Sequence, residues 1–184
     1  GQIAKLLASE GLSWRAFVKS ELFDWDQARL AKETGCVALC TGIESASPRI
    51  KKLVKKTNTI EDDTKFVHLC LAHGLRPKVF LILGLPGESR ETFEETRRWL
   101  LDMIVEGLDD FDVTIFTPYP GSPIYEDLIS HGGRGEGIHL EHPLDYLSDP
   151  VFFKGIPGQY KSWTGTPDLT GEEIIRLRDE LDQE

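Results

Sequence analysis

The chain has 184 residues, of which 40% are hydrophobic and 28% charged, and its formal net charge is −10. This length suits one domain with its own core, and no apolar run approaches the roughly 20 residues that span a bilayer. The acidic balance opposes non-specific binding to nucleic acid, which depends on Lys and Arg neutralising phosphates. We therefore expect neither a membrane nor a nucleic-acid partner. The N-terminus lacks the features of a signal peptide, so we expect a cytoplasmic protein.

The segment PRIKKLVKK is the locally basic part of the chain. We interpret it as a solvated helix face, with Lys51 and Lys52 each four residues before another lysine, Lys55 and Lys56. The three cysteines, Cys36, Cys40 and Cys70, are an odd number, which argues against a secreted disulfide framework and fits a reducing compartment.

Apolar runs suited to buried parallel strands alternate along the chain with helical patterns, which is typical of an α/β fold with a parallel sheet. The predicted elements, in chain order, are a helix at 2–10, a strand at 14–20, a helix at 25–34, a strand at 36–43, helices at 47–56 and 59–73, a strand at 78–83, a helix at 90–106 and a strand at 111–116. The strand at 36–43 is apolar on both alternations, so we expect it to be covered on both faces.

Capping residues support several of these helix boundaries. Thr59 and Ser89 are predicted N-caps, and Gly35 and Gly74 stand where helix C-terminal glycines occur. Residues 130–150 are predicted to form a long loop with little regular structure, with His131, His139 and His142 in no standard metal-site spacing. A final helix is predicted to begin after Thr170, with Glu173 completing a capping box.

Polar and glycine-rich or proline-rich segments follow three of the predicted strands. GIESAS follows 36–43, GLPGES follows 78–83 and TPYPGSP follows 111–116. Ligands of parallel α/β folds bind at the carboxyl ends of strands, so these segments are candidates for one common site. GLPGES is not a phosphate-binding Walker loop, because no GK[ST] follows it.

Glu44 is the most informative single residue, because it directly follows a buried apolar strand. A carboxylate there needs a partner to offset its desolvation, such as a ligand hydroxyl or a cation. A helix cap or a structural salt bridge would satisfy it equally well. Ser45 and Ser47 are N-cap candidates for the following helix.

The order of four segments resembles the radical S-adenosylmethionine (SAM) enzymes, iron-sulfur oxidoreductases, in the branch that often carries a cobalamin-binding domain. The segments are ETGCVALCTGIESASPRIKKLVKKTNTIED, GLRPKVFLILGLPGESRETFEET, FDVTIFTPYPGSPIYE and LTGEEIIRLRDEL, and the resemblance that they carry extends over nearly the whole chain. The resemblance implies a partial TIM-like (β/α) barrel of parallel strands. Residues 1–125 would be the C-terminal half of that core, and 126–184 an extension of irregular chain ending in a helix.

The resemblance also implies which residues face SAM. Glu44 and Ser45, with Ser47 beside them, would contact its ribose or carboxylate, and Lys56 would face the carboxylate. Gly84 and Gly87 would let the backbone approach the flat adenine ring, since a Cβ would collide with it. The full set of implied cofactor-binding residues is Glu44, Ser45, Ser47, Lys56, Ile82, Leu83, Gly84, Pro86, Gly87, Phe116, Thr117 and Tyr119.

The chain departs from the family at the cluster-binding motif. Members bind a 4Fe-4S cluster through CxxxCxxC after the first strand, and this motif is absent. Cys36 and Cys40 lie on a predicted strand about 13 Å apart, too far to bind one cluster. We therefore expect a fragment of a longer enzyme, with the cluster ligands upstream and cobalamin a candidate cofactor of that parent. An exposed sheet edge would also favour dimerisation.

Three functions follow from these observations. The first is a segment of a radical SAM enzyme that supplies the ribose, adenine and carboxylate side of the SAM site, is inactive alone, and acts in the parent by producing a 5'-deoxyadenosyl radical on an unknown small-molecule substrate. The second is a degenerate nucleoside-binding module without redox chemistry. The third is an ordinary α/β enzyme with Glu44 or Glu88 as general base, assisted by His73.

Overall fold

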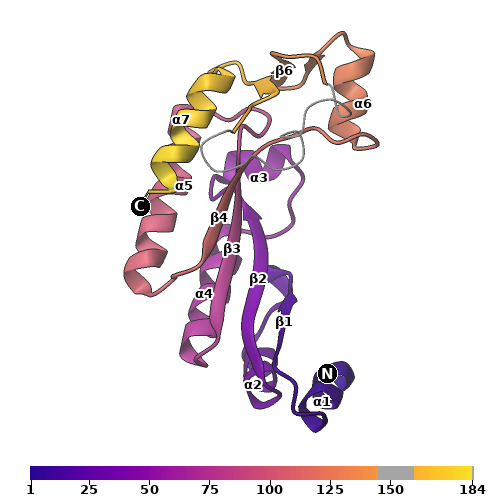
Figure 1. The fold of residues 1–184 in the computed structure, drawn as a ribbon. Helices are drawn as coiled ribbons and strands as arrows, with labels where there is room; N and C mark the ends of the chain where they lie inside the picture. The colour runs from indigo at the N-terminus through magenta and orange to yellow at the C-terminus, as the bar shows by residue number, and fades with distance from the viewer. Residues whose placement is uncertain (145–159, 184) are drawn as a thin grey trace. The chain divides into compact units, whose positions relative to one another are not determined.

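The computed structural model describes residues 1–144 and 160–183. Its main sheet has four parallel strands in the order β1-β2-β3-β4 (Figure 1). These strands are Trp14–Phe17, Cys36–Glu44, Arg76–Leu83 and Phe111–Ile115. The helices among them are α1 (Gln2–Ser9), α2 (Trp25–Glu33), α3 (Pro48–Leu53), α4 (Ile60–Ala72) and α5 (Arg90–Glu106), with a 3-10 turn, η1, at Ser20–Leu22. The predicted α/β class with a parallel sheet is confirmed, and no closed barrel is formed by the described residues.

The chain after β4 forms further regular structure. Helix α6 (Pro123–Ser130) is followed by a small antiparallel sheet of β5 (Arg134–Gly135), β6 (Ile138–Leu140) and β7 (Thr164–Gly165), and by α7 (Gly171–Leu181). The prediction of little regular structure from 130 onward is therefore wrong for 134–140. Residues 145–150 of that predicted loop lie outside the described residues.

Two compact units share the elements. The first comprises 1–43, 56–81 and 98–112, and the second comprises 44–55, 82–97 and 113–184. The units interleave along the chain, whereas the sequence predicted consecutive segments, 1–125 and 126–184; that division remains a prediction. Each unit is described by itself below.

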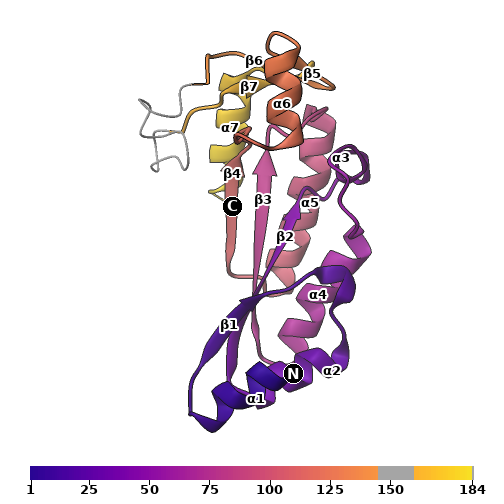
Figure 2. The same ribbon diagram turned by 90° about the vertical axis from the view of Figure 1, so that its right-hand side faces the viewer.

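A buried carboxylate joins η1 to α4 in the first unit. Asp63 is fully buried, and its Oδ1 accepts hydrogen bonds from Ser20 Oγ and Asn58 Nδ2, both at 2.6 Å. The core beside it contains Phe23 and Phe66, whose rings meet edge to face at 5.4 Å. Helices α2 and α4 lie side by side in Figure 2. Because a buried charge is costly unless it is hydrogen-bonded, Asp63 fixes how η1 sits on α4.

The helix boundaries that were predicted from capping residues are confirmed. Thr59 and Thr170 each form a capping box, with Asp62 and Glu173 respectively. Gly35 and Gly74 follow helix ends with φ of +83° and +64°, which is the left-handed conformation that glycine adopts at low cost.

The apolar alternation of β2 and β3 was only partly interpreted correctly. Val79, Leu81 and Leu83 of β3 are buried, while Phe80 between them is half-buried. On β2, Val37 is 56% exposed, so the prediction that this strand is covered on both faces is wrong at that position. Leu39 and Ile43 on the same face are buried, as is Cys40 on the other, so the prediction holds further along the strand. An apolar run indicates that a strand face is stabilised by burial. It does not show whether another element covers that face at every position. Among the described residues, no helix is long and apolar enough to cross a bilayer.

Candidate functional site at the strand ends

The predicted site residues lie at the carboxyl ends of β2, β3 and β4. Glu44 is the last residue of β2, and residues 82–87 contain the end of β3 and the turn after it. The ends of β3 and β4 are joined by a hydrogen bond from Phe116 N–H to Leu83 O, at 2.7 Å. All these residues belong to the second unit, whereas Lys56 belongs to the first.

Glu44 has a strained backbone. Its φ is +64°, in the left-handed region, and its side chain is half-buried. For a residue with a Cβ, this conformation costs about 1–2 kcal/mol and is maintained only where the surrounding structure imposes it. Such strain is concentrated at functional sites, so Glu44 remains the leading candidate of the sequence analysis.

The serines after Glu44 are built into the turn between β2 and α3. Ser45 Oγ lies 3.1 Å from Thr96 Oγ1 of α5, and it also accepts a hydrogen bond from Ser47 N–H at 3.1 Å. Ser47 is the N-cap residue of α3 by position, but its buried hydroxyl has no hydrogen-bond partner. Ser45 therefore fixes the backbone that follows Glu44, and a direct contact of either hydroxyl with a ligand remains a prediction.

The basic segment differs from its interpretation as a solvated helix face. Lys51 is only 4% exposed, and Lys55 lies beyond the end of α3 with a φ of +57°. Lys56 donates a hydrogen bond from Nζ to Gly42 O at 2.9 Å. The i,i+4 pattern failed because α3 ends at Leu53, after only six residues.

Glu88 closes the turn after β3. The carboxylate is 1% exposed, and its Oε2 accepts a hydrogen bond from Gly84 N–H at 2.5 Å, while Oε1 is buried and has no hydrogen-bond partner among residues 1–144 and 160–183. Burial raises the pKa of Glu88 from 4.5 to about 7, although the N–H groups of Gly84 and Leu85 oppose the rise. The side chain thus folds back onto its own turn, which also makes it unsuitable as a solvent-facing general base.

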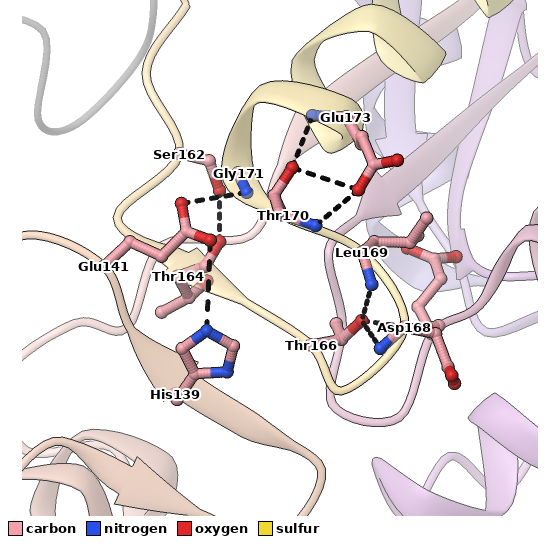
Figure 3. Close-up of polar contacts among 11 residues, drawn as sticks. His139, Glu141, Ser162, Thr164, Thr166, Asp168, Leu169, Thr170, Gly171 and Glu173 are labelled. Atoms are coloured by element: carbon pink, nitrogen blue, oxygen red, sulfur yellow. Dashed lines mark hydrogen bonds and ion pairs between the residues drawn. The ribbon is translucent and has the colours of Figure 1, made fainter.

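Three segments of the second unit also hold this turn. Arg49 of α3 donates from Nη2 to Gly87 O at 2.9 Å, and Gly87 N–H donates to Gly137 O at 2.7 Å. Thr166 Oγ1 donates to Glu88 O at 2.7 Å, and it accepts the N–H of Leu169 just before α7 (Figure 3). Residues 84–88 are therefore fixed from several sides by polar contacts.

The two glycines of the turn have a structural requirement within the chain itself, and the predicted close approach of adenine remains a prediction. Gly84 and Gly87 have φ of +81° and +77°. A Cβ on Gly84 would lie 3.2 Å from Ile174, and a Cβ on Gly87 would lie 2.6 Å from Leu53 Cδ1. The left-handed backbone is therefore the main requirement for glycine at both positions, and an added Cβ would also require Ile174 or Leu53 to shift.

The tip after β4 is more open than the turn after β3. Phe116 and Thr117 are half-buried, Thr117 Oγ1 donates to Ile115 O at 3.5 Å, and Tyr119 is 44% exposed. These side chains and half-buried Ile82 are accessible to a ligand. Leu83 and Pro86 are buried, so only their backbone is a candidate for contact.

A polar network near α7 was not anticipated from the sequence. Glu141 accepts the Gly171 N–H through Oε2 at 2.9 Å, and so adds a carboxylate to the N-terminus of α7, as Figure 3 shows. Its other oxygen lies 3.9 Å from His139 Nε2. Glu141 and Gly171 are 30 residues apart, so no local pattern announces this contact.

Comparisons with known proteins agree with this architecture. The radical SAM superfamily model matches residues 2–100, more than half of the chain. A methyltransferase of Pyrococcus horikoshii, described as uncharacterized, is 34% identical over 131 residues, 70% of this chain and 28% of that protein. Bacteriochlorophyllide d C-12(1)-methyltransferase of Chlorobaculum tepidum is 27% identical over 66% of this chain and 26% of that protein.

Solved structures show the same fold. TsrM from Kitasatospora setae, a radical SAM methyltransferase solved with cobalamin and a 4Fe-4S cluster, superposes with a TM-score of 0.67 at 18% identity, over 98% of this chain and 39% of that one. The coproporphyrinogen III oxidase HemN from Escherichia coli superposes with a TM-score of 0.53 at 20% identity, over 65% of this chain and 28% of that one. The chain belongs to the radical SAM superfamily. It spans about a quarter of the length of the curated relatives named above.

The superfamily implies SAM and a 4Fe-4S cluster, and the cysteines of this chain do not fit the cluster. Cys36 and Cys40 lie on β2 and Cys70 lies on α4, and all three are buried. Burial raises the pKa of all three thiols, and that of Cys70 to about 12, so the thiolates that would bind iron are disfavoured. Within 1–144 and 160–183, no group of three or more His, Cys, Asp or Glu side chains is arranged to hold a metal ion.

The raised pKa of Glu88 predicts a specific dependence of stability on pH. The folded state binds this proton more tightly than the unfolded state, so the contribution of Glu88 is greatest below pH 4.5, decreases as pH rises to about 7 and is level above that. The difference is about 3 kcal/mol in the free energy of unfolding. Chemical denaturation from pH 5 to pH 8 should show the decrease in the wild type and a smaller one in Glu88→Gln. Glu91→Gln, an exposed change in α5, should behave as the wild type; equal slopes for all three proteins would contradict the assignment.

A second prediction concerns Gly87, where the left-handed backbone and the nearby Leu53 side chain both restrict an added Cβ. Gly87→Ala should destabilise the fold by about 2–4 kcal/mol, because both the left-handed backbone and the contact with Leu53 disfavour a Cβ. Gly121→Ala is the matched control: its φ is +82°, but nothing lies within 4 Å of the added Cβ. It should cost only about 1–2 kcal/mol. Unfolding in urea measures both, and equal losses would show that Leu53 does not restrict this turn.

Proposed function

We propose that this chain supplies the ribose, adenine and carboxylate side of the SAM site in a longer radical SAM enzyme. The observation that carries the proposal is Glu44, a carboxylate held in the left-handed conformation at the carboxyl end of a parallel strand. Parallel α/β folds place their ligands at such strand ends. Membership of the radical SAM superfamily supports SAM as the ligand.

The chemistry that each group offers is consistent with this role. The Glu44 carboxylate is an acceptor for the ribose hydroxyls, and half-buried Ile82 offers apolar surface for adenine, against which the backbone of residues 82–84 would lie. Phe116 and Tyr119 supply accessible aromatic surface after β4. Lys56, with its Nζ at the carbonyl of Gly42, would face the SAM carboxylate. The protein thereby binds and orients the cofactor, and the cofactor carries the difficult chemistry.

The fixed turn at 84–88 is the second element of the proposal. Hydrogen bonds to Gly84, Gly87 and Glu88 hold the backbone before a ligand arrives. Because a preorganised loop loses little conformational entropy on binding, more of the contact energy remains as affinity. Glu88 acts here as a positioning residue, through Gly84 N–H.

The redox part of the reaction lies outside this chain. We propose that a 4Fe-4S cluster, bound by residues of the parent that are not in this sequence, supplies the electron for reductive cleavage of SAM. The named methyltransferases make methyl transfer a candidate reaction and cobalamin a candidate cofactor of the parent, while the substrate is set by segments outside these residues.

A nucleoside-binding module without redox chemistry is the second candidate, because the described cysteines do not suit a cluster. Full-length protein that binds SAM but retains no iron after reconstitution would favour it. The third possibility, an ordinary α/β enzyme with Glu44 or Glu88 as general base, has less support. Glu88 is 1% exposed, and the ring of His73 meets that of Trp25 edge to face while its Nδ1 lies 2.8 Å from Leu69 O.

The decisive variant is Glu44→Asn in the full-length protein. Asn tolerates the left-handed conformation but lacks the charge, so the melting temperature should change little. SAM affinity should fall about tenfold or more, since a hydrogen bond to a charged group contributes about 1.5–3 kcal/mol. Equilibrium dialysis with labelled SAM measures this loss.

Lys55→Asn is the matched control, because Lys55 is the other non-glycine residue with a positive φ among those that the structure describes, at +57°. It should leave SAM affinity within about twofold, since it does not lie at a strand end. Equal SAM affinity in the wild type and Glu44→Asn would contradict the assignment of Glu44 to the SAM site.

A further inference from the structure

A groove of about 560 Å³ lies in the second unit between α6, the β5–β6 hairpin and the end of α3. We name it the α6 groove. Its apolar lining comes from Leu53, Pro86, Ile124 and Ile138. Figure 2 shows α6 beside the strands of this hairpin. The volume is within the range of small-molecule sites, which are mostly apolar with a few convergent polar groups.

Two cations without partners line the same groove. Lys55 and Arg134 are exposed, and within the described part of the chain neither forms an ion pair or a side-chain hydrogen bond. This is notable in a chain of net charge −10, where acidic partners are abundant. Lys55 and Arg134 are therefore available to an anion.

The groove also has two acidic residues in its lining, Asp127 and Glu136. Asp127 pairs with His131, with Oδ1 at 3.1 Å from Nδ1, and it packs so closely under the hairpin that a Cβ on Gly135 would lie 2.9 Å from its Oδ2. Glu136 is exposed. Asp127 is thus held beside His131, and both carboxylates of the groove would oppose a bound anion.

The backbone of Lys55 supports a role for its side chain. Its φ is +57°, a conformation in which glycine or asparagine would be favoured over lysine. A strained residue at the edge of a cavity indicates that the structure fixes where its side chain is presented. Here that placement adds a cation to the groove beside the apolar side chain of Leu53.

We propose that the α6 groove binds a small organic anion, a carboxylate or phosphate ester with an apolar body. The anionic group would lie between Lys55 and Arg134, and the apolar body would contact Leu53, Ile124 and Ile138. This site is separate from the strand ends and does not rest on the proposed SAM site. Pro86, however, belongs both to this groove and to the turn after β3, and the Gly87 N–H of that turn donates to Gly137 O in the hairpin. A bound anion would therefore contact the turn through Pro86.

Equilibrium dialysis of the full-length protein with labelled benzoate or phenyl phosphate tests this inference, with benzyl alcohol as the neutral analogue. Saturable binding of either anion is expected, at least about tenfold tighter than binding of the alcohol, because the charged contacts distinguish them. The tighter of the two anions identifies the preferred head group.

Variants assign the binding to the groove. Lys55→Gln with Arg134→Gln should weaken anion binding about tenfold or more, and Glu136→Gln should strengthen it. Lys52→Gln with Arg176→Gln changes the net charge equally at two exposed positions, and should have less than about a twofold effect. Circular dichroism melting confirms that each variant is folded. No saturable binding, equal binding of the alcohol, or equal losses in the two double variants would overturn the proposal, whatever the result for SAM.

Discussion

The Glu88 carboxylate, buried and bonded to the Gly84 N–H, is the constraint on which the rest of the candidate site depends. It closes the turn after β3, so that the carbonyls of Gly87 and Glu88 face Arg49 and Thr166. Each partner comes from a different segment, and α3, the β5–β6 hairpin and the start of α7 are thereby tied to one short turn. Burial disfavours the ionised form of this carboxyl and thereby raises its pKa to about 7. The neutral form is therefore populated near neutral pH.

Local signals in the sequence predicted the main elements well. The capping boxes at Thr59 and Thr170 and the glycines after helix ends act within a few residues, so they can be recognised without tertiary information. Helix α6 had such a signal as well: Ser122 is its N-cap and Pro123 its first residue, a pair typical of helix starts, which the sequence analysis did not use. The hairpin β5–β6 has strands of two and three residues, too short for an alternating pattern to show.

The candidate site was predictable in location and less so in physical detail. Strand ends followed by glycine and polar residues identified Glu44 and the turn at 84–88, because that rule depends on the order of elements alone. The roles of Ser45, Lys51 and Gly87 depend on contacts with Thr96, the short helix α3 and Leu53, which are distant in sequence or set by where a helix stops. The glycines illustrate the difference: the residue type was interpreted as a requirement, the left-handed backbone supplies a reason within the chain itself, and the close approach of an adenine ring remains a prediction.

Amide hydrogen exchange of the full-length protein, with and without SAM, tests whether the ends of β2 and β3 form part of the SAM site. If the strand ends form the SAM side of the site, SAM should slow exchange in peptides containing residues 44–47 and 82–88, and leave peptides of α1 and β1 unchanged. Protection confined to other segments, or none in 44–47 and 82–88 at saturating SAM, would contradict the assignment of the SAM site to these strand ends.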